Sequence, residues 1–164
     1  MRMRDYRSAD AAVLAEILHA AVHEIGGRDY TAAQLADWSP APLSAESFHS
    51  RVSDGRSVFV AVSAADVPHA FIELERDGHI DCFYCHPEVA GTGVGRLLFA
   101  HLKTAAIAAR IPRLYVEASE AARRFLLREG FHVIARRDFE RGGVEIHNYD
   151  MELRLSHLGD GNRA

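Results

Sequence analysis

The stretch that decides the fold is residues 83–96, Phe-Tyr-Cys-His-Pro-Glu-Val-Ala-Gly-Thr-Gly-Val-Gly-Arg. A strand-like run stops at Pro87, every second residue from 91 to 95 is glycine, and apolar residues recur at helical spacing from Val94 onward. Backbone N–H groups at a helix start carry partial positive charge, and glycines let an anion approach them. The stretch predicts a strand, a glycine turn (residues 90–95) suited to phosphate, and a helix. Alternatively, the glycines only make a tight turn.

Two familiar phosphate-binding motifs do not fit the glycine turn. No Gly-Lys-Ser/Thr follows it, so it is not a Walker loop. It is a poor Rossmann fingerprint too, because it lies in mid-chain after three strands that look antiparallel.

Strand and helix patterns are mixed over the whole length, which predicts the α/β class. Helices are expected at 9–25, from Thr31 towards Trp38, and at 44–52, 93–110 and 120–129. The helix over 9–25 is expected to end at the pair Gly26-Gly27. Strands are expected at 1–6, 56–63, 69–75, 79–85, 114–119, 131–139 and 144–155.

The composition is that of an ordinary globular protein, with 164 residues, 48% of them hydrophobic and 26% charged. We expect a single domain over residues 1–155 and a loose polar tail over 156–164. The formal charge of −4 argues against an electrostatic nucleic-acid partner. No apolar run is long enough for a membrane span and no export signal is apparent, so we expect a cytoplasmic protein with no membrane partner.

Two motifs at the right separation resemble the GNAT superfamily of acetyl-CoA-dependent N-acetyltransferases. The glycine turn, preceded by His86-Pro87, is similar to the family's motif A. Residues 114–131, where a strand leads to Ser119, a helix and Gly130-Phe131, are similar to its motif B. Either motif alone would be weak evidence. The resemblance covers about residues 2–155.

The resemblance implies a GNAT-like mixed, twisted sheet of about seven strands with helices on both faces. The central strands should separate after Tyr84 and admit the pantetheine of acetyl-CoA, the cosubstrate. No metal is implied. The implied cofactor-binding residues are Phe83, Tyr84, Cys85, Ala90, Gly91, Thr92, Gly93, Val94, Gly95, Arg96 and Ser119.

Three residues depart from the family pattern. Ala90 replaces the usual Gln or Arg, a position that acts largely through its backbone N–H. Ser119 replaces a common Asn and can still form hydrogen bonds. Leu126 stands where many members carry the tyrosine that protonates the leaving thiolate, so the resemblance does not supply the usual general acid at this position.

Three residues are candidates for catalysis, each with a structural alternative. Glu117 lies inside a predicted strand, where partial burial would raise the pKa of its carboxyl towards that of a useful base, although an ion pair with an arginine is the alternative. Tyr84 and Tyr149 could donate a proton or simply pack as strand aromatics. Cys85 as an acyl carrier lacks an obvious base beyond His86.

The acceptor is expected to be a small-molecule or peptide amine that attacks the thioester directly. In this family, recognition often comes from the N-terminal helices, which here carry His23, Tyr30 and Trp38, with Glu24 and Asp29 nearby. A cation or an amine could lie against either aromatic ring, or the rings could only pack the helices. A homodimer through the exposed last strand is left open.

Two patterns suggest other chemistry but lack support. Cys82, Cys85 and His86 match the spacing of a c-type haem attachment, which requires export, and packed cysteines are favoured instead. His19 and His23 lie one helical turn apart without a clear third ligand, so a solvated helix face is favoured over metal. The rival functions are a non-catalytic acyl-CoA-binding regulatory module and a different nucleotide-binding enzyme.

Overall fold

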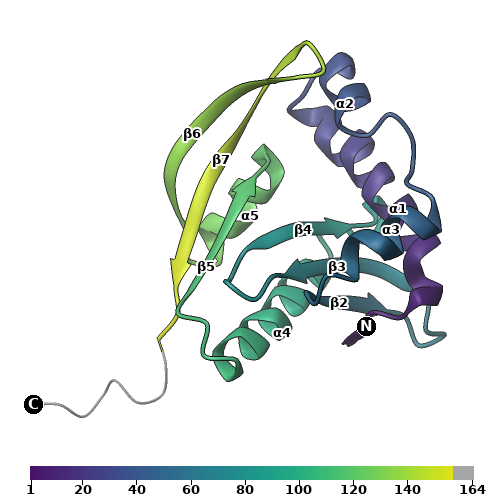
Figure 1. Cartoon of the computed structure of the whole chain (residues 1–164), viewed down its shortest axis with the longest axis vertical. Coiled ribbons are helices and arrows are strands. Elements are labelled where there is room, and N and C mark those ends of the chain that lie inside the picture. The colour runs from purple at the N-terminus through teal and green to yellow at the C-terminus, as the bar shows by residue number, and fades with distance from the viewer. Residues whose placement is uncertain (157–164) are drawn as a thin grey trace, which may run out of the picture.

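The computed structural model describes residues 1–156, so most of the expected tail lies outside the described residues. Within them the chain forms seven β-strands and five α-helices, which confirms the predicted α/β class (Figure 1). In chain order they are β1 (Arg2–Asp5), α1 (Ala11–Ala20), α2 (Ala32–Trp38), α3 (Ala45–Val52), β2 (Ser57–Val62), β3 (Pro68–Leu74), β4 (Ile80–Cys85), α4 (Val94–Ala108), β5 (Arg113–Ala118), α5 (Glu120–Arg128), β6 (His132–Arg141) and β7 (Val144–Arg154).

The first sheet is antiparallel, with strand order β1-β2-β3-β4, and helices cover both of its faces. Alternate residues of β2 separate two cores, because successive side chains of a strand point to opposite faces. Phe59 and Ala61 pack in the cluster that contains α4 residues such as Leu98. Val58 and Val60 pack with α1 and α3. The prediction of helices on both faces is confirmed.

The second sheet has strand order β5-β7-β6, and a single parallel bridge joins it to the first. That bridge pairs His79 with Tyr115, and the Tyr115 N–H donates to the Gly78 carbonyl at 3.1 Å. No other pairing joins β4 to β5 within residues 1–156. The strands therefore separate as expected, but from the first residues of β4 rather than after Tyr84.

The N-terminal helix is longer and less regular than the sequence suggests. A π-helical turn (Ala21–Ile25) follows α1, and a 3₁₀ turn (Gly26–Arg28) follows that. The expectation that Gly26-Gly27 would end the helix is therefore wrong: Gly26 has φ −64° and ψ −26°, so the glycine continues the helical backbone. The capping box predicted at Thr31 is confirmed, with the Gln34 N–H donating to the Thr31 hydroxyl at 3.2 Å.

The hairpin of β6 and β7 extends to α2, far from α2 in the sequence (Figure 1). The Gln34 side-chain amide donates to the Glu145 carbonyl at 2.8 Å. Among the described residues, none of the helices is both long enough and apolar enough to cross a bilayer.

Candidate functional site

A cavity of about 480 Å³ lies where β4 and β5 separate. Its size is within the usual range for small-molecule sites. The N-terminal helices, β4, the glycine turn and α5 all contribute to its walls, which are formed by Ala21, Val22, Ile25, Gly26, Tyr30, Trp38, Phe83, Tyr84, Cys85, Ala90, Gly91, Gly93, Gly95, Arg96, Ser119, Ala121, Ala122, Phe125, Arg128 and Glu129.

The glycine turn has the geometry of an anion cradle. Gly91 and Gly93 adopt φ +80° and φ +93°, a left-handed conformation that favours glycine. A Cβ built on either residue would meet no atom within 4 Å, so the space in front of the turn is open. The first intrahelical bond of α4 runs from the Leu97 N–H to the Gly93 carbonyl, at 3.2 Å. The N–H groups of residues 94–96 precede it and are free to bind an anion.

Two arginines add positive charge to the rim of this cradle. Arg96 leaves 80% of its side chain exposed and lies 3.7 Å from the Glu129 carboxylate. Arg128 also lines the cavity, from the last turn of α5. The cradle therefore offers oriented N–H groups and guanidinium groups to a phosphate.

The start of α4 lies against β4. A Cβ on Gly95 would stand 3.4 Å from the Phe83 ring and 3.5 Å from the Cys85 sulfur. The Phe125 ring of α5 meets Phe83 edge-on, with ring centroids 5.2 Å apart. This packing holds the cradle beside the last residues of β4.

The backbone of β4 is open on the side of the cavity. The His86 N–H donates to the His69 carbonyl of the neighbouring strand segment at 2.8 Å. In an antiparallel strand, the backbone groups of alternate residues bond the same neighbouring strand. The backbone N–H and carbonyl of Tyr84 therefore point to β3, as those of His86 do. Those of Phe83 and Cys85 point the other way, to the open edge. That edge can pair with an extended amide-containing ligand.

Six apolar or aromatic side chains form the part of the cavity that we call the acceptor wall: Ala21, Val22, Ile25, Tyr30, Trp38 and Tyr84. The Tyr30 and Trp38 rings meet edge-to-face with centroids 5.7 Å apart. The π-helical turn supplies the first three members, and π turns of this kind are frequent at functional sites.

Comparison with known proteins identifies the family. The model of the acetyltransferase (GNAT) domain family matches residues 27–153. The crystal structure of a GCN5-related N-acetyltransferase from Rhodopseudomonas palustris is 31% identical, covers 94% of this chain and 95% of that one, and superposes with a TM-score of 0.85. The chain belongs to the GNAT acetyltransferase family.

Other solved GNAT structures share the fold at lower identity. A phosphinothricin acetyltransferase from Sinorhizobium meliloti, in complex with AcCoA, is 18% identical over 99% of this chain and 91% of that one, with a TM-score of 0.74. A putative acetyltransferase from Salmonella typhimurium, with its cofactor acetyl-CoA, is 22% identical over 100% of this chain and 99% of that one, with a TM-score of 0.72. No curated protein sequence shows significant similarity.

The cavity of this GNAT acetyltransferase brings together most of the residues predicted to bind the cofactor. Two lie outside its lining. The Thr92 hydroxyl donates to the Val89 carbonyl at 2.7 Å, and the Val94 side chain is buried in the core. Ser119 lines the cavity and also caps α5, because its hydroxyl accepts from the Ala122 N–H at 3.2 Å.

The three catalytic candidates occupy different places in the acetyltransferase. Tyr84 lines the cavity, and burial, followed by the nearby Cys82 and Glu73, raises the pKa of its phenol well above the ordinary value. Glu117 lies outside the cavity lining, and its carboxylate contacts Nε2 of His79 near the bridge between the sheets. Tyr149 also lies outside the lining.

The Tyr149 hydroxyl belongs to a network at the start of α5. It donates to Oε1 of Glu120 at 2.7 Å, and Nε2 of His147 lies 2.9 Å from the same oxygen. Desolvation alone would raise the pKa of Glu120, but hydrogen bonds from Tyr149, His147 and Arg123 outweigh it and lower the pKa to about 2. Glu120 is therefore an ionised structural carboxylate with occupied oxygens.

Position 126, where the family often has tyrosine, lies in the core of this protein. Leu126 is 1% exposed and does not line the cavity. The neighbouring Phe125 lines it instead. Sequence reasoning missed Phe125 and Arg128, although both follow Ala121 at the i+4 and i+7 spacing of one helix face.

Of the predicted substrate residues, Tyr30 and Trp38 belong to the acceptor wall and His23 does not. Nε2 of His23 lies 2.7 Å from the Ser39 carbonyl, and its ring lies 4.5 Å from that of His19. The other two nearby candidates also lie outside the lining, since Asp29 pairs with Arg124 at 2.7 Å and Glu24 is exposed.

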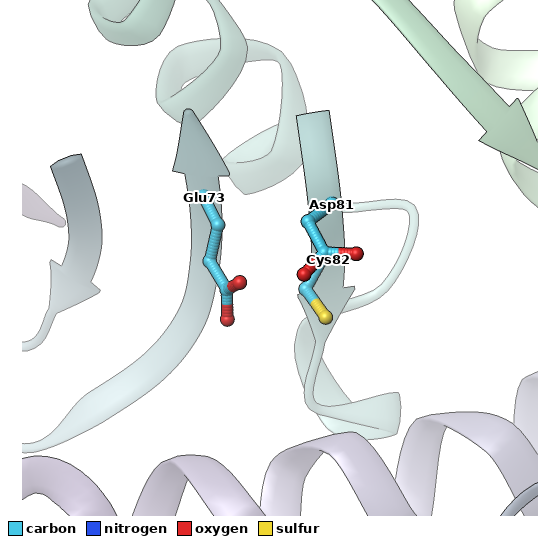
Figure 2. Close-up of side chains that lie close together, drawn as sticks. All are labelled: Glu73, Asp81 and Cys82. Atoms are coloured by element: carbon cyan, nitrogen blue, oxygen red, sulfur yellow. The ribbon is translucent and has the colours of Figure 1, made fainter. Parts of the chain in front are cut away.

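A second polar cluster lies at the start of β4, away from the cavity. Figure 2 shows Glu73, Asp81 and Cys82 close enough together to suggest a metal site. Glu73 is fully buried, however, and its two carboxylate oxygens bind the guanidinium groups of Arg51 and Arg56. The positive charges of Arg51 and Arg56 already neutralise the carboxylates that a metal ion would need as ligands. The cluster is therefore an ion-pair network rather than a cation site.

Proposed function

We propose that this GNAT enzyme transfers an acetyl group from acetyl-CoA to a primary amine by direct attack in a ternary complex. The observation that carries the proposal is the glycine turn, with left-handed Gly91 and Gly93 in front of open space at the start of α4. In relatives of the same fold, solved structures contain AcCoA or coenzyme A. Family membership supports the reaction type.

The residues present fit the cosubstrate. The backbone N–H groups of residues 94–96 and the guanidinium groups of Arg96 and Arg128 would bind the pyrophosphate. The open edge of β4 at Phe83 and Cys85 would pair with the pantetheine amides. Acetyl-CoA supplies a thioester whose carbonyl carbon is open to attack by an amine. A backbone N–H near Cys85 would polarise that carbonyl.

Tyr84 is the one catalytic candidate on the cavity wall. Because the pKa of its phenol is raised, Tyr84 stays protonated at neutral pH and can donate a hydrogen bond. A thiol has an ordinary pKa near 8.5. Full proton transfer from Tyr84 to a departing thiolate is therefore uphill, and Tyr84 acts by orienting or solvating a reacting group.

A pair of matched variants tests the cradle. Gly93→Glu places a negative side chain in the space where the phosphate would lie, whereas Gly143→Glu makes the same change at a hairpin glycine that has φ +82° and nothing within 4 Å. Acetyl-CoA should raise the melting temperature of the wild type and of Gly143→Glu, because a ligand that binds only the native state stabilises it. Gly93→Glu should lose the shift. An unchanged shift in Gly93→Glu would show that the cradle assignment is wrong.

Two rivals have different signatures. A non-catalytic acyl-CoA-binding module, which the loss of tyrosine at Leu126 favours, would give the melting shift without thiol release on any amine. A different nucleotide-binding enzyme would prefer ATP or NAD over acetyl-CoA in the same melt. Release of free thiol that requires both acetyl-CoA and an amine would support the acetyltransferase.

The expected homodimer through the last strand is wrong in its strand, because β7 pairs with β5 on one side and β6 on the other and has no free edge within the described residues; we propose β6 as the dimer edge instead. β6 is an edge strand of the second sheet, and all ten of its residues are exposed. An open edge of this length can pair with the same edge of a second copy. Light scattering measures the mass in solution, and a monomer at all concentrations would contradict the dimer.

A further inference from the structure

The acceptor end of the cavity has an unusual shortage of ionisable groups. Within the described residues, the cavity is lined by only six side chains that can titrate: Tyr30, Tyr84, Cys85, Arg96, Arg128 and Glu129. The single carboxylate, Glu129, faces Arg96 at the cradle. The acceptor wall, as defined above, contains no carboxylate and no imidazole.

The three other titratable groups cannot remove a proton from an ammonium at neutral pH. Burial raises the pKa of the Cys85 thiol to about 11 and raises that of Tyr84 further. The Tyr30 hydroxyl donates to the His147 carbonyl at 3.0 Å and accepts from the Glu120 N–H at 3.1 Å. All three are protonated at neutral pH, so none of them can serve as the base.

The carboxylates next to the acceptor wall already bind other side chains. The Glu120 carboxylate accepts from His147 and Tyr149 and lies 3.2 Å from Arg123. Asp29 binds Arg124 in a two-bond pair. An ammonium placed on the acceptor wall would therefore lose its hydration without gaining a counter-charge, which is costly.

We propose that the acceptor binds as an uncharged amine attached to an apolar or aromatic body. The class is the α-amine of an apolar amino-acid amide or an apolar peptide N-terminus, not the alkylammonium of a lysine side chain or a polyamine. This inference rests on the proposed acetyltransferase function. Its physical basis is that an α-amine has a pKa near 8, whereas an alkylamine has one near 10.4. At pH 7 the uncharged fraction therefore differs by roughly 200-fold.

Two acceptors with one ring system test the idea: phenylalanine amide and phenethylamine. With saturating acetyl-CoA, kcat/KM at pH 7 should be at least about 10-fold higher for phenylalanine amide, because more of it is uncharged. Between pH 6 and 10, kcat/KM should level off near pH 8 for phenylalanine amide and should still be rising at pH 10 for phenethylamine, because each profile breaks at the pKa of its acceptor. The break should therefore move when the acceptor is exchanged. A break at the same pH for both acceptors would reveal an enzyme base and overturn the inference.

A gain of charge in the wall gives an independent test. Ile25 lines the cavity and is only partly buried, so Ile25→Glu adds a counter-charge, with Ile25→Gln as the matched control. Relative to Ile25→Gln, Ile25→Glu should lower KM for phenethylamine by about 10-fold at pH 7, within the range measured for partly buried ion pairs. The acetyl-CoA melting shift verifies that both variants are folded. An equal KM in the two variants would contradict the inference.

These results separate the two levels of the proposal. Turnover with a fixed pH break would overturn only the uncharged-amine inference. Thiol release with other amines of a panel but with neither of these two would overturn only this inference. An acetyl-CoA melting shift without thiol release on any amine of the panel would overturn the proposed function and this inference with it.

Discussion

The Tyr30 hydroxyl donates a hydrogen bond to the His147 carbonyl, 117 residues away in the sequence, at 3.0 Å. The same hydroxyl accepts from the Glu120 N–H at 3.1 Å. One side chain thereby ties the helical segment of the acceptor wall to β7 and to the start of α5. Tyr30 is 6% exposed, so this junction is shielded from water.

Tyr30→Phe should destabilise the protein by about 1–3 kcal/mol, because it leaves the partly buried His147 carbonyl and Glu120 N–H without their partner. The matched control is Tyr6→Phe, since the Tyr6 hydroxyl contacts His49 in an exposed setting and its loss should cost less than about 1 kcal/mol. Urea unfolding measures both. Equal losses in the two variants would contradict the role of Tyr30 as an anchor.

Glu73→Gln should cost about 3 kcal/mol or more, because it leaves the guanidinium groups of Arg51 and Arg56 beside a neutral, fully buried side chain. Glu46→Gln, at an exposed position in the first turn of α3, is the control and should change stability by less than about 0.5 kcal/mol. Denaturant unfolding checks both values. A loss at Glu73 no larger than at Glu46 would show that the ion pairs are weak.

Divalent metal ions should not change the stability of the cluster of Glu73, Asp81 and Cys82. Because Glu73 already binds two guanidinium groups, we expect EDTA and millimolar Mg²⁺ to leave the melting temperature of the acetyltransferase unchanged. Differential scanning fluorimetry measures the shift. Stabilisation by Mg²⁺ that disappears in Asp81→Asn would identify a cation site there and contradict the ion-pair interpretation.

Protonation of His79 should stabilise the bridge between the two sheets. Burial lowers the pKa of its ring, but hydrogen bonds to Glu117 and Glu75 outweigh this and raise the pKa above its ordinary value. A raised pKa in the folded state means that the contribution is complete below about pH 6.5 and is lost as the pH rises through the folded-state pKa. The stability difference between the wild type and His79→Gln, measured in urea, should shrink from pH 6 to pH 9. A constant difference would contradict this coupling.

Cys85 should be dispensable as a nucleophile. Burial raises the pKa of its thiol to about 11, so little thiolate is present at neutral pH. Cys85→Ala should retain kcat within about 10-fold, and initial-rate plots should intersect, because parallel lines are the sign of a covalent intermediate. Parallel lines together with an inactive Cys85→Ala would contradict direct transfer.

The sequence was most informative where local chemistry decides the backbone. Thr31 and Gln34 predicted their helix start because a capping box needs only four consecutive residues. The glycine turn was predictable for the same reason, since φ near +90° at Gly93 favours glycine whatever surrounds it.

Long-range partners could not be predicted from the same patterns. The alternation of side chains correctly predicted a strand that contains Glu117. The sequence does not show that His79 contacts Glu117 across the bridge between the sheets. Leu126 could be aligned with a catalytic tyrosine, yet its burial depends on how α5 packs against the core. Both positions are set by contacts between distant elements.

The π-helical turn from Ala21 to Ile25 has a genetic consequence. A π turn accommodates one more residue than an α-helical turn. An in-frame deletion of a single codon inside it would restore an α-helical turn and leave the helix on either side in its present register, so the change would be confined to the turn itself. Ala21, Val22 and Ile25, which line the cavity, all lie within that turn. A one-codon change could therefore remodel acceptor choice while leaving the phosphate cradle, encoded some 65 codons downstream, untouched.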